Sequence, residues 1–245
     1  MPTITDTITT ADGSCTVTFC TPEGEGPWPG VVMYPDAGGA RQTFTEMAQR
    51  LAGLGYAVLV PDVYYRDPGW APFEMETVFS DAAERSRLFG MIAKVTPEIM
   101  AADAAAFFDY LDDRPEVRGS AFGTTGYCMG GRTSLTVAGR LPERVAVAMS
   151  FHGGGLVSDD AGSPHLLADA IRATVYVGGA KGDASFTAEH AETLGKALTA
   201  AGVEHTIEIY DAGHGFAVPD NAPFDEAAAE RHWQAMQSVF GASPR

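Results

Sequence analysis

The stretch Gly-Tyr-Cys-Met-Gly-Gly at residues 126–131 places a cysteine where an apolar, strand-like run gives way to a helical pattern. A sharp strand-to-helix turn here would hold Cys128 in a strained backbone conformation, with its side chain clear of the sheet. Gly126 and Gly130 lack the Cβ atoms that would clash across such a tight turn. The N-terminus of the following helix would favour a thiolate, the nucleophilic form of cysteine. An inert, buried cysteine in a glycine-rich turn is the alternative interpretation.

Apolar, strand-like runs alternate with helical patterns on both sides of this turn. Strands are predicted at 30–34, 57–60, 120–126, 145–151, 174–178 and 204–210. Helices are predicted from about 42 to 54, 97 to 112, 129 to 139, 187 to 201 and 221 to 240. The alternation predicts an α/β protein with a mostly parallel twisted sheet and helices on both faces.

The two least regular parts of the chain are the N-terminus and a long central segment. Residues 3–20 predict two strands around a turn at 11–14, so that residues 1–29 form an N-terminal hairpin and loop. Residues 62–96 are rich in aromatic residues, proline and glycine, which suggests an ordered excursion over a pocket or, alternatively, a packed surface loop. No repeat, low-complexity segment or convincing linker interrupts the sequence, so we expect residues 1–245 to form a single domain.

Composition excludes several classes of partner. The net charge of −16 and the pI near 4.6 argue against binding to nucleic acid or to an anionic membrane surface. No apolar run is long enough to span a membrane and no secretory signal is visible, so we expect a cytoplasmic protein, either a monomer or a homodimer. Three cysteines are too few for a disulfide framework, and Cys15 and Cys20 should face opposite sides of one strand as structural residues. The histidine and cysteine spacings match no metal motif, and we expect neither a metal nor an organic cofactor.

Two further polar residues follow predicted strands, at the sheet edge where sites of α/β proteins lie. Asp183 and His214 each lie in a glycine-rich loop, and the chain order Cys128, Asp183, His214 is that of the α/β-hydrolase fold. Each residue alone could be an ordinary loop residue, but their joint placement favours a catalytic triad. Asp211 is the rival acid, although it lies in the same loop as His214 and is badly placed to reach the far ring nitrogen.

A triad of this kind needs donors for the oxyanion that forms on the substrate. The N–H of Met129, the residue after the nucleophile, should supply one, and the N–H of Ala37, after the strand at 30–34, the other. An ordinary strand-to-helix turn explains the glycines around Ala37 equally well. His152 also follows a strand and can line the pocket, with a hydrogen-bonded loop histidine as the alternative.

Together these motifs resemble the dienelactone hydrolase family. The resemblance is carried by the sequence at 126–131, by a late Gly-His-Gly-Phe, by the glycine-rich loop before Asp183 and by the chain length, and it extends from about residue 30 to residue 240. It implies a cysteine-dependent α/β-hydrolase that opens a lactone ring, with Cys128 as nucleophile, Asp183 as the orienting acid and His214 as base.

The sequence departs from the family pattern at one residue near the nucleophile. Family members keep a glutamate after the first buried parallel strand, where it contacts the resting thiol. This chain has Asp36 there, which is one methylene shorter. The resemblance therefore leaves the contact between Asp36 and Cys128 open.

A second departure concerns substrate charge. Family members that bind an anionic dienelactone carry an arginine four residues beyond the catalytic histidine, where this chain has Val218. Other family arginines follow the second parallel strand, where Arg66, Arg85 and Arg87 are candidates and where Tyr64 also lies close to the site. Without the arginine at 218, we expect neutral esters or lactones to be hydrolysed at least as well as the anionic dienelactone.

The sequence thus predicts an enzyme that hydrolyses a small ester or lactone through a cysteinyl acyl-enzyme. A thioester hydrolase or another acyl-transfer enzyme using the same site is the first alternative. The second is a non-catalytic or redox-sensing protein of the α/β-hydrolase fold, in which Cys128 is oxidised rather than acylated.

Overall fold

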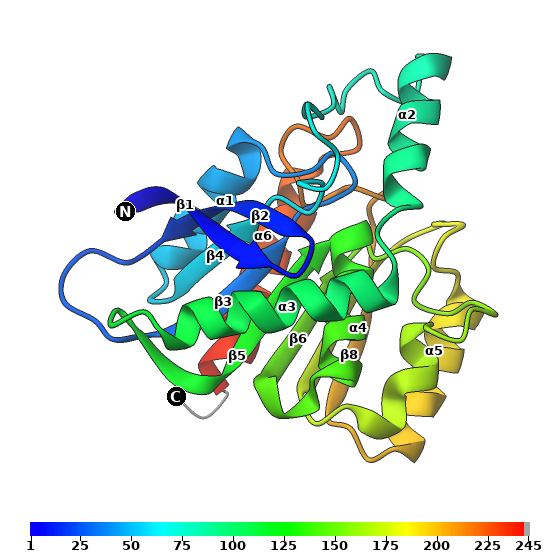
Figure 1. Cartoon of the computed structure of the whole chain (residues 1–245). Helices are drawn as coiled ribbons and strands as arrows, with labels where there is room; N and C mark the ends of the chain where they lie inside the picture. The colour runs from blue at the N-terminus through cyan, green and yellow to red at the C-terminus, as the bar shows by residue number, and fades with distance from the viewer. Residues whose placement is uncertain (243–245) are drawn as a thin grey trace.

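The computed structural model of the chain describes residues 1–242, and its strands form one mixed sheet (Figure 1). The strands are β1 (Thr3–Thr10), β2 (Gly13–Cys20), β3 (Trp28–Tyr34), β4 (Ala57–Pro61), β5 (Val117–Tyr127), β6 (Val145–Phe151), β7 (Thr174–Ala180) and β8 (His205–Tyr210). Their order across the sheet is β1-β2-β4-β3-β5-β6-β7-β8. The β1–β2 and β2–β4 pairs are antiparallel and every other pair is parallel, which confirms the predicted mostly parallel sheet, and β1 and β2 form a hairpin.

Helices cover both faces of this sheet, as predicted (Figure 1). They are α1 (Gln42–Ala52), α2 (Ala82–Ile92), α3 (Pro97–Asp112), α4 (Met129–Arg140), α5 (Ala188–Ala200) and α6 (Glu226–Ala242), with short 3₁₀ turns at Pro142–Arg144 and Pro164–Ala170. Buried side chains of α3, α4 and α5 pack together on one face, while those of α1 and α6 pack on the other. Helix α6 begins five residues later than its predicted start at 221, because residues 221–225 form turns beside the His214 loop.

The core explains why the central strands read as unbroken apolar runs. All five residues of β4 are buried, since parallel strands in this sheet have helices on both sides. Cys15 and Cys20 are fully buried in different core clusters, one on each face, as their spacing predicts. Both thiols are therefore packing residues.

The segment at 62–96 contains a helix that the sequence pattern did not predict. Helix α2 buries only Leu88 and Met91, so it lacks the apolar stripe that would reveal its period. Its start is fixed by Asp81, whose carboxylate accepts hydrogen bonds from two N–H groups of the first turn. The helix projects from one end of the molecule (Figure 1), and the turns before it pack into a small third core cluster that includes Ala37 and Met129.

Within residues 1–242, no helix is both long enough and apolar enough to cross a membrane.

Candidate active site

The turn between β5 and α4 has the strained geometry that its glycines predict. Cys128 is the N-cap residue of α4 and has φ 52° and ψ −114°, a region that non-glycine residues rarely occupy. A Cβ at Gly126 would lie 2.0 Å from the Gly130 carbonyl oxygen, and one at Gly130 would lie 2.3 Å from that of Tyr34. Only glycine fits at these two positions, so the sequence enforces the turn that lifts Cys128 above the sheet.

Asp183 and His214 are brought together from the loops after β7 and β8. The His214 Nδ1 and Asp183 Oδ2 atoms are 2.6 Å apart, and the side chains are 36% and 5% exposed respectively. Asp211, the rival acid, instead forms an exposed ion pair with Lys181 at 2.6 Å. The geometry therefore selects Asp183 as the partner of His214.

Ser185 is a site residue that the sequence analysis missed. Its backbone N–H and its Oγ donate to Asp183 Oδ1 at 2.8 Å and 2.7 Å. These two bonds occupy one carboxylate oxygen and leave Oδ2 directed at His214. A serine two residues after an aspartate is common in turns, so the sequence signal was too weak to single it out.

The charges of this pair shift both pKa values in the directions expected for an ion pair. Burial opposes ionisation of His214, but hydrogen bonds to Asp183 and Cys128 outweigh it and raise its pKa to about 10. Burial likewise opposes ionisation of Asp183, yet hydrogen bonds from His214 and Ser185 lower its pKa to about 2. At neutral pH the site therefore favours an imidazolium held between the carboxylate and the cysteine.

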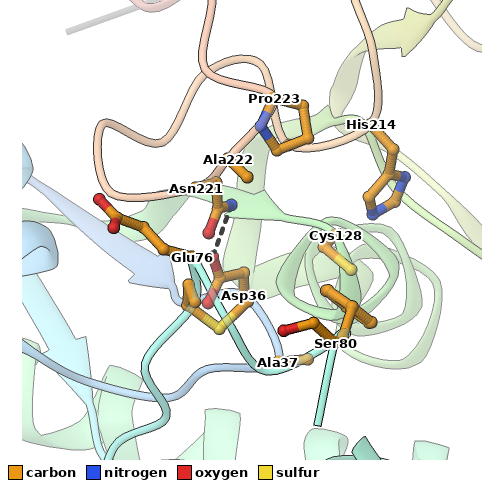
Figure 2. Close-up of a pocket in the computed structure, with 12 residues that line it drawn as sticks. Asp36, Ala37, Glu76, Ser80, Cys128, His214, Asn221, Ala222 and Pro223 are labelled. Atoms are coloured by element: carbon orange, nitrogen blue, oxygen red, sulfur yellow. Dashed lines mark hydrogen bonds between the residues drawn. The ribbon is translucent and has the colours of Figure 1, made fainter.

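Cys128 and His214 open into a cavity of about 380 Å³, within the size range of small-ligand sites (Figure 2). Its walls come from the loop after β3, the segment before α2, the turn between β5 and α4, and the loop after β8. The lining residues are Asp36, Ala37, Met75, Glu76, Phe79, Ser80, Cys128, His214, Gly215, Asn221, Ala222 and Pro223. The walls are mostly apolar, and Cys128 and His214 lie at one end.

Tyr64 links the two residues whose N–H groups were predicted to bind an oxyanion. Its hydroxyl donates to the Ala37 carbonyl at 2.9 Å and contacts the Met129 sulfur at 3.5 Å. Among the backbone hydrogen bonds of residues 1–242 outside helices and strands, none uses the N–H of Ala37 or of Met129, and Met129 is the first residue of α4, where an N–H has no acceptor within its own helix. Tyr64 is buried and lies behind the cavity wall, so it supports the loop rather than contacting a ligand.

Comparison with known proteins identifies the family to which this chain belongs. A model of the dienelactone hydrolase family matches residues 16–243. The chain belongs to the dienelactone hydrolase family. The predicted family, the α/β-hydrolase fold and the assignment as a dienelactone hydrolase-like enzyme are thereby confirmed.

Individual relatives are distant but cover nearly the whole chain. A protein of Synechocystis sp. named "Putative carboxymethylenebutenolidase" is 27% identical over 89% of this chain and 88% of its own length. One of the same name from Escherichia coli strain K12 is 28% identical, covering 89% of this chain and 78% of that protein. The crystal structure of a putative dienelactone hydrolase from Klebsiella pneumoniae superposes with a TM-score of 0.85 at 24% identity, covering 98% of each chain. The dienelactone hydrolase-like promiscuous phosphotriesterase P91, from metagenomic libraries, superposes with a TM-score of 0.78 at 28% identity, again over 98% of each chain.

Asp36, which replaces the family glutamate, makes no hydrogen bond to Cys128 within residues 1–242. Its carboxylate accepts from Arg41 at 2.6 and 3.0 Å, from Asn221 at 3.1 Å and from the Gly38 N–H at 2.9 Å. Arg41 also binds Asp220, at 2.6 and 2.7 Å. This network ties the loop after β3 to the loop that follows His214, and the sequence analysis predicted neither Arg41 nor the two residues of the second loop that take part, Asp220 and Asn221.

The expectation that Arg66 contributes to the site is wrong. Its guanidinium binds Asp103 at 2.7 Å and Asp12 at 2.9 Å, and it does not line the cavity. Its position just past β4 placed it near the site in sequence, but these two carboxylates hold it at the β1–β2 turn and α3. Val218, which replaces the family arginine, is fully buried.

His152 matches neither interpretation that the sequence offered. It is fully buried, has a positive φ of 39°, and its ring centroid lies 5.2 Å from that of His214. It does not line the cavity, and neither ring nitrogen has a hydrogen-bond partner within residues 1–242. Burial lowers its pKa well below the usual value, so a neutral ring packs against that of His214 in a T-shaped contact.

Proposed function

We propose that the enzyme hydrolyses small esters or lactones with Cys128 as nucleophile, His214 as base and Asp183 as the orienting acid. The observation that carries this proposal is the 2.6 Å contact between His214 and Asp183 at a cavity that Cys128 also lines. The strained backbone of Cys128 at a helix N-terminus supports the nucleophilic role.

Each residue of the triad has one task in the reaction. Asp183 accepts the Nδ1–H of His214, which fixes the tautomer and leaves Nε2 for Cys128. His214 holds the thiol proton while the Cys128 sulfur attacks the ester carbonyl, and it then gives that proton to the leaving alkoxide. A thioester between Cys128 and the acyl group results. Water then attacks this thioester as His214 takes its proton, and the acid leaves as that proton returns to the sulfur.

The negative charge on the carbonyl oxygen needs donors during both attacks. We assign this role to the N–H groups of Ala37 and Met129. Both are free of backbone acceptors in the described chain, and Tyr64 holds the Ala37 peptide through its carbonyl. The whole mechanism uses side chains and backbone groups of this chain, without a metal or organic cofactor.

A panel of small esters and lactones tests the proposal with purified wild type, Cys128→Ala and Cys15→Ala. We expect the Cys128 variant to lose at least about a thousandfold in kcat/KM, and the Cys15 variant to keep turnover if it folds. Intact-protein mass spectrometry after rapid acid quench should show one acyl group, and peptide mapping should place it on Cys128. Full activity of a folded Cys128→Ala would contradict the proposal.

The same panel separates the rival functions. Thioesters belong in it, because an acyl-transfer enzyme on this site would prefer them. A neutral phosphotriester also belongs in it, because the relative P91 is described as a promiscuous phosphotriesterase and an uncharged triester suits the apolar walls of this cavity. A redox-sensing protein would instead turn over none of these compounds and would form a sulfenic acid on Cys128 with peroxide.

A further inference from the structure

We infer that the cavity beside Cys128 selects ester substrates that are uncharged or cationic and rejects carboxylates. This inference rests on the proposed hydrolase function and names the substrate class of that site. It departs from an enzyme that binds an anionic dienelactone, and it rests on the charges that line or adjoin the cavity.

The ionisable lining residues other than the proposed catalytic pair are carboxylates. Asp36 and Glu76 line the cavity, and of residues 1–242 no lysine or arginine does. The remaining walls are apolar or carry uncharged polar groups, with Met75 and Phe79 on the side formed by the segment before α2. Outside the proposed catalytic pair, where the His214 imidazolium is already held by Asp183, a bound carboxylate would therefore lose water without gaining a cationic partner, which is costly in an apolar site.

Arg41, which lies behind the cavity wall, does not reverse the negative charge of the lining carboxylates. Arg41 neutralises Asp36, but its Nε and Nη2 atoms also bind Asp220. Two carboxylates share one guanidinium, so the group keeps one net negative charge beside the cavity. Both hydrogen-bonding edges of that guanidinium are occupied, and a substrate anion could bind it only by displacing a carboxylate.

Glu76 adds a second negative charge at the other end of the cavity from His214 (Figure 2). It is exposed, and it forms no ion pair within residues 1–242. Its charge is therefore not cancelled locally. An uncancelled carboxylate suits an ammonium or an uncharged group rather than an anion, and the face of an aromatic ring such as Phe79 also attracts cations.

The nearby arginines are engaged elsewhere, with one exception that serves as the rival explanation. Arg66 and Arg87 pair with carboxylates outside the cavity. Arg85 is exposed and donates to the carbonyl of Phe79 at 2.9 Å, but it has no acidic partner within residues 1–242. If any cation reaches a substrate anion here, it is Arg85.

Three para-substituted phenyl acetates test the inference, of which the anion and the neutral amide are matched in shape. They are 4-acetoxybenzoate, 4-acetoxybenzamide and (4-acetoxybenzyl)trimethylammonium, which share the acetyl group and differ in charge at the para position. Each kcat/KM is divided by the rate of the same ester with hydroxide, to remove differences in leaving-group reactivity. We expect the normalised kcat/KM of the anionic ester to be at least about tenfold below that of the amide. The value for the cationic ester should equal or exceed that of the amide.

Two glutamine variants locate the charge that discriminates. Glu76→Gln should raise the ratio of kcat/KM for the anionic ester to kcat/KM for the cationic ester by about threefold to tenfold. Glu74→Gln removes the same charge from an exposed residue in the same segment that does not line the cavity, and it should leave the ratio unchanged within about twofold. Equal effects of the two variants would show that general surface charge, rather than the cavity, sets the preference.

A second measurement does not require hydrolysis. Anionic and cationic methanethiosulfonates, with sulfonatoethyl and trimethylammonioethyl groups, modify Cys128 directly, and their rate ratio is compared with that of a free thiol. We expect the cationic reagent to modify wild-type Cys128 faster than the anionic reagent, relative to the free thiol, and this advantage to be smaller in Glu76→Gln. If no ester is hydrolysed but this ratio holds, the proposed function fails and the charge selection stands. If the anionic ester is preferred and Arg85→Gln abolishes that preference, the charge selection is wrong while the hydrolase stands.

Discussion

The cavity has two unlike walls. One carries Cys128, at the turn after the buried end of β5, and His214, in the loop after the edge strand β8, and the hydrogen bonds among His214, Asp183 and Ser185 fix its geometry. The other comes from the segment before α2, where Met75, Glu76, Phe79 and Ser80 line the cavity from turns with few buried side chains.

This difference suggests that the two walls have different roles in catalysis and in substrate binding. Reacting groups need positions held within a fraction of an ångström, and loops anchored on the parallel strands and tied by hydrogen bonds provide this. Groups that contact the rest of the substrate can vary with little cost to the fold, because they lie on a surface segment. We therefore expect changes in the first wall to act on kcat and changes in the second to act on KM and on substrate preference.

The largest expected effect comes from the buried acid of the first wall. Asp183→Asn should lower kcat by up to about ten-thousandfold with the fold intact, because the imidazole loses the acceptor that sets its tautomer. Asp211→Asn, which removes an exposed carboxylate three residues before His214, should stay within about twofold of wild type. The measurements are steady-state kinetics and circular dichroism of both variants. A larger loss in Asp211→Asn would overturn the assignment of the acid.

Thiol reactivity should also separate the first wall from the rest of the chain. Cys128 should be alkylated by iodoacetamide at least about a hundredfold faster than the other cysteines, because it lies in the cavity and at a helix N-terminus. Cys15 is fully buried, and burial raises its pKa to about 12, while burial also raises the pKa of Cys20. Peptide mapping after substoichiometric labelling measures the order. Preferential labelling of Cys20 would count against the proposed nucleophile.

The first wall could be predicted from the sequence better than the second, because it lies on regular buried elements and the second lies on a surface segment. Central strands are apolar on both sides, and glycines at 126 and 130 are required by contacts of 2.0 and 2.3 Å, so both leave strong local signals. The sheet, the helices on its faces and the turn at Cys128 could therefore be predicted. Helix α2 could not, because it buries only Leu88 and Met91 and has no apolar period.

Site residues show the same limit. Asp183 and His214 follow strands in glycine-rich loops, and the fold brings such loops to one edge. Arg41 and Asp220 pair across 179 positions in the sequence, and no local pattern reports such a pair. Arg66 was misplaced for the complementary reason: its neighbours in sequence lie near the site, but its charge is satisfied by Asp103.

Ser185→Ala removes one of the two bonds that position Asp183. We expect kcat to fall by about tenfold with little change in KM, because the carboxylate keeps its bond from the backbone N–H. The hydrogen bonds from Ser185 help to lower the pKa of Asp183, so the acid limb of the pH–rate profile should move to higher pH. Ser185→Thr, which keeps the hydroxyl, should restore most of the activity. An unchanged acid limb in Ser185→Ala would indicate a purely structural role.

A truncation in the second wall should have a smaller effect of a different kind. Phe79→Ala should raise KM by about fivefold and leave kcat within about twofold, since it removes apolar contact that is equal in the ground and transition states. Phe89→Ala is the matched control, because Phe89 is equally exposed, at 56% against 55%, but does not line the cavity. An effect of Phe79→Ala on kcat alone would mean that this wall also positions the reacting groups.

The smallest expected effect is on stability and depends on pH. His214 has a pKa raised from 6.5 to about 10, so its share of the ion-pair stabilisation is complete below pH 6.5 and is lost as the pH rises through 10. Asp183 has a pKa lowered from 3.8 to about 2, so its share is present above pH 3.8 and is lost as the pH falls through 2. The pair therefore stabilises the fold most between these limits, from pH 3.8 to pH 6.5.

The free energy of unfolding of Asp183→Asn should accordingly fall below that of wild type by about 1 kcal/mol near pH 5.5, a figure kept small because the His214 side chain is 36% exposed and screened by solvent. The gap should narrow as the pH rises to 10, where His214 is neutral in the unfolded chain and about half deprotonated in the folded protein. Urea denaturation at pH 5.5, 8 and 10 measures it, with Asp211→Asn as a control that should show no such narrowing below pH 10, since its partner is a lysine. A gap that widens with pH would mean that the pair is held in the neutral form, and the imidazolium on which the first wall depends would then be absent.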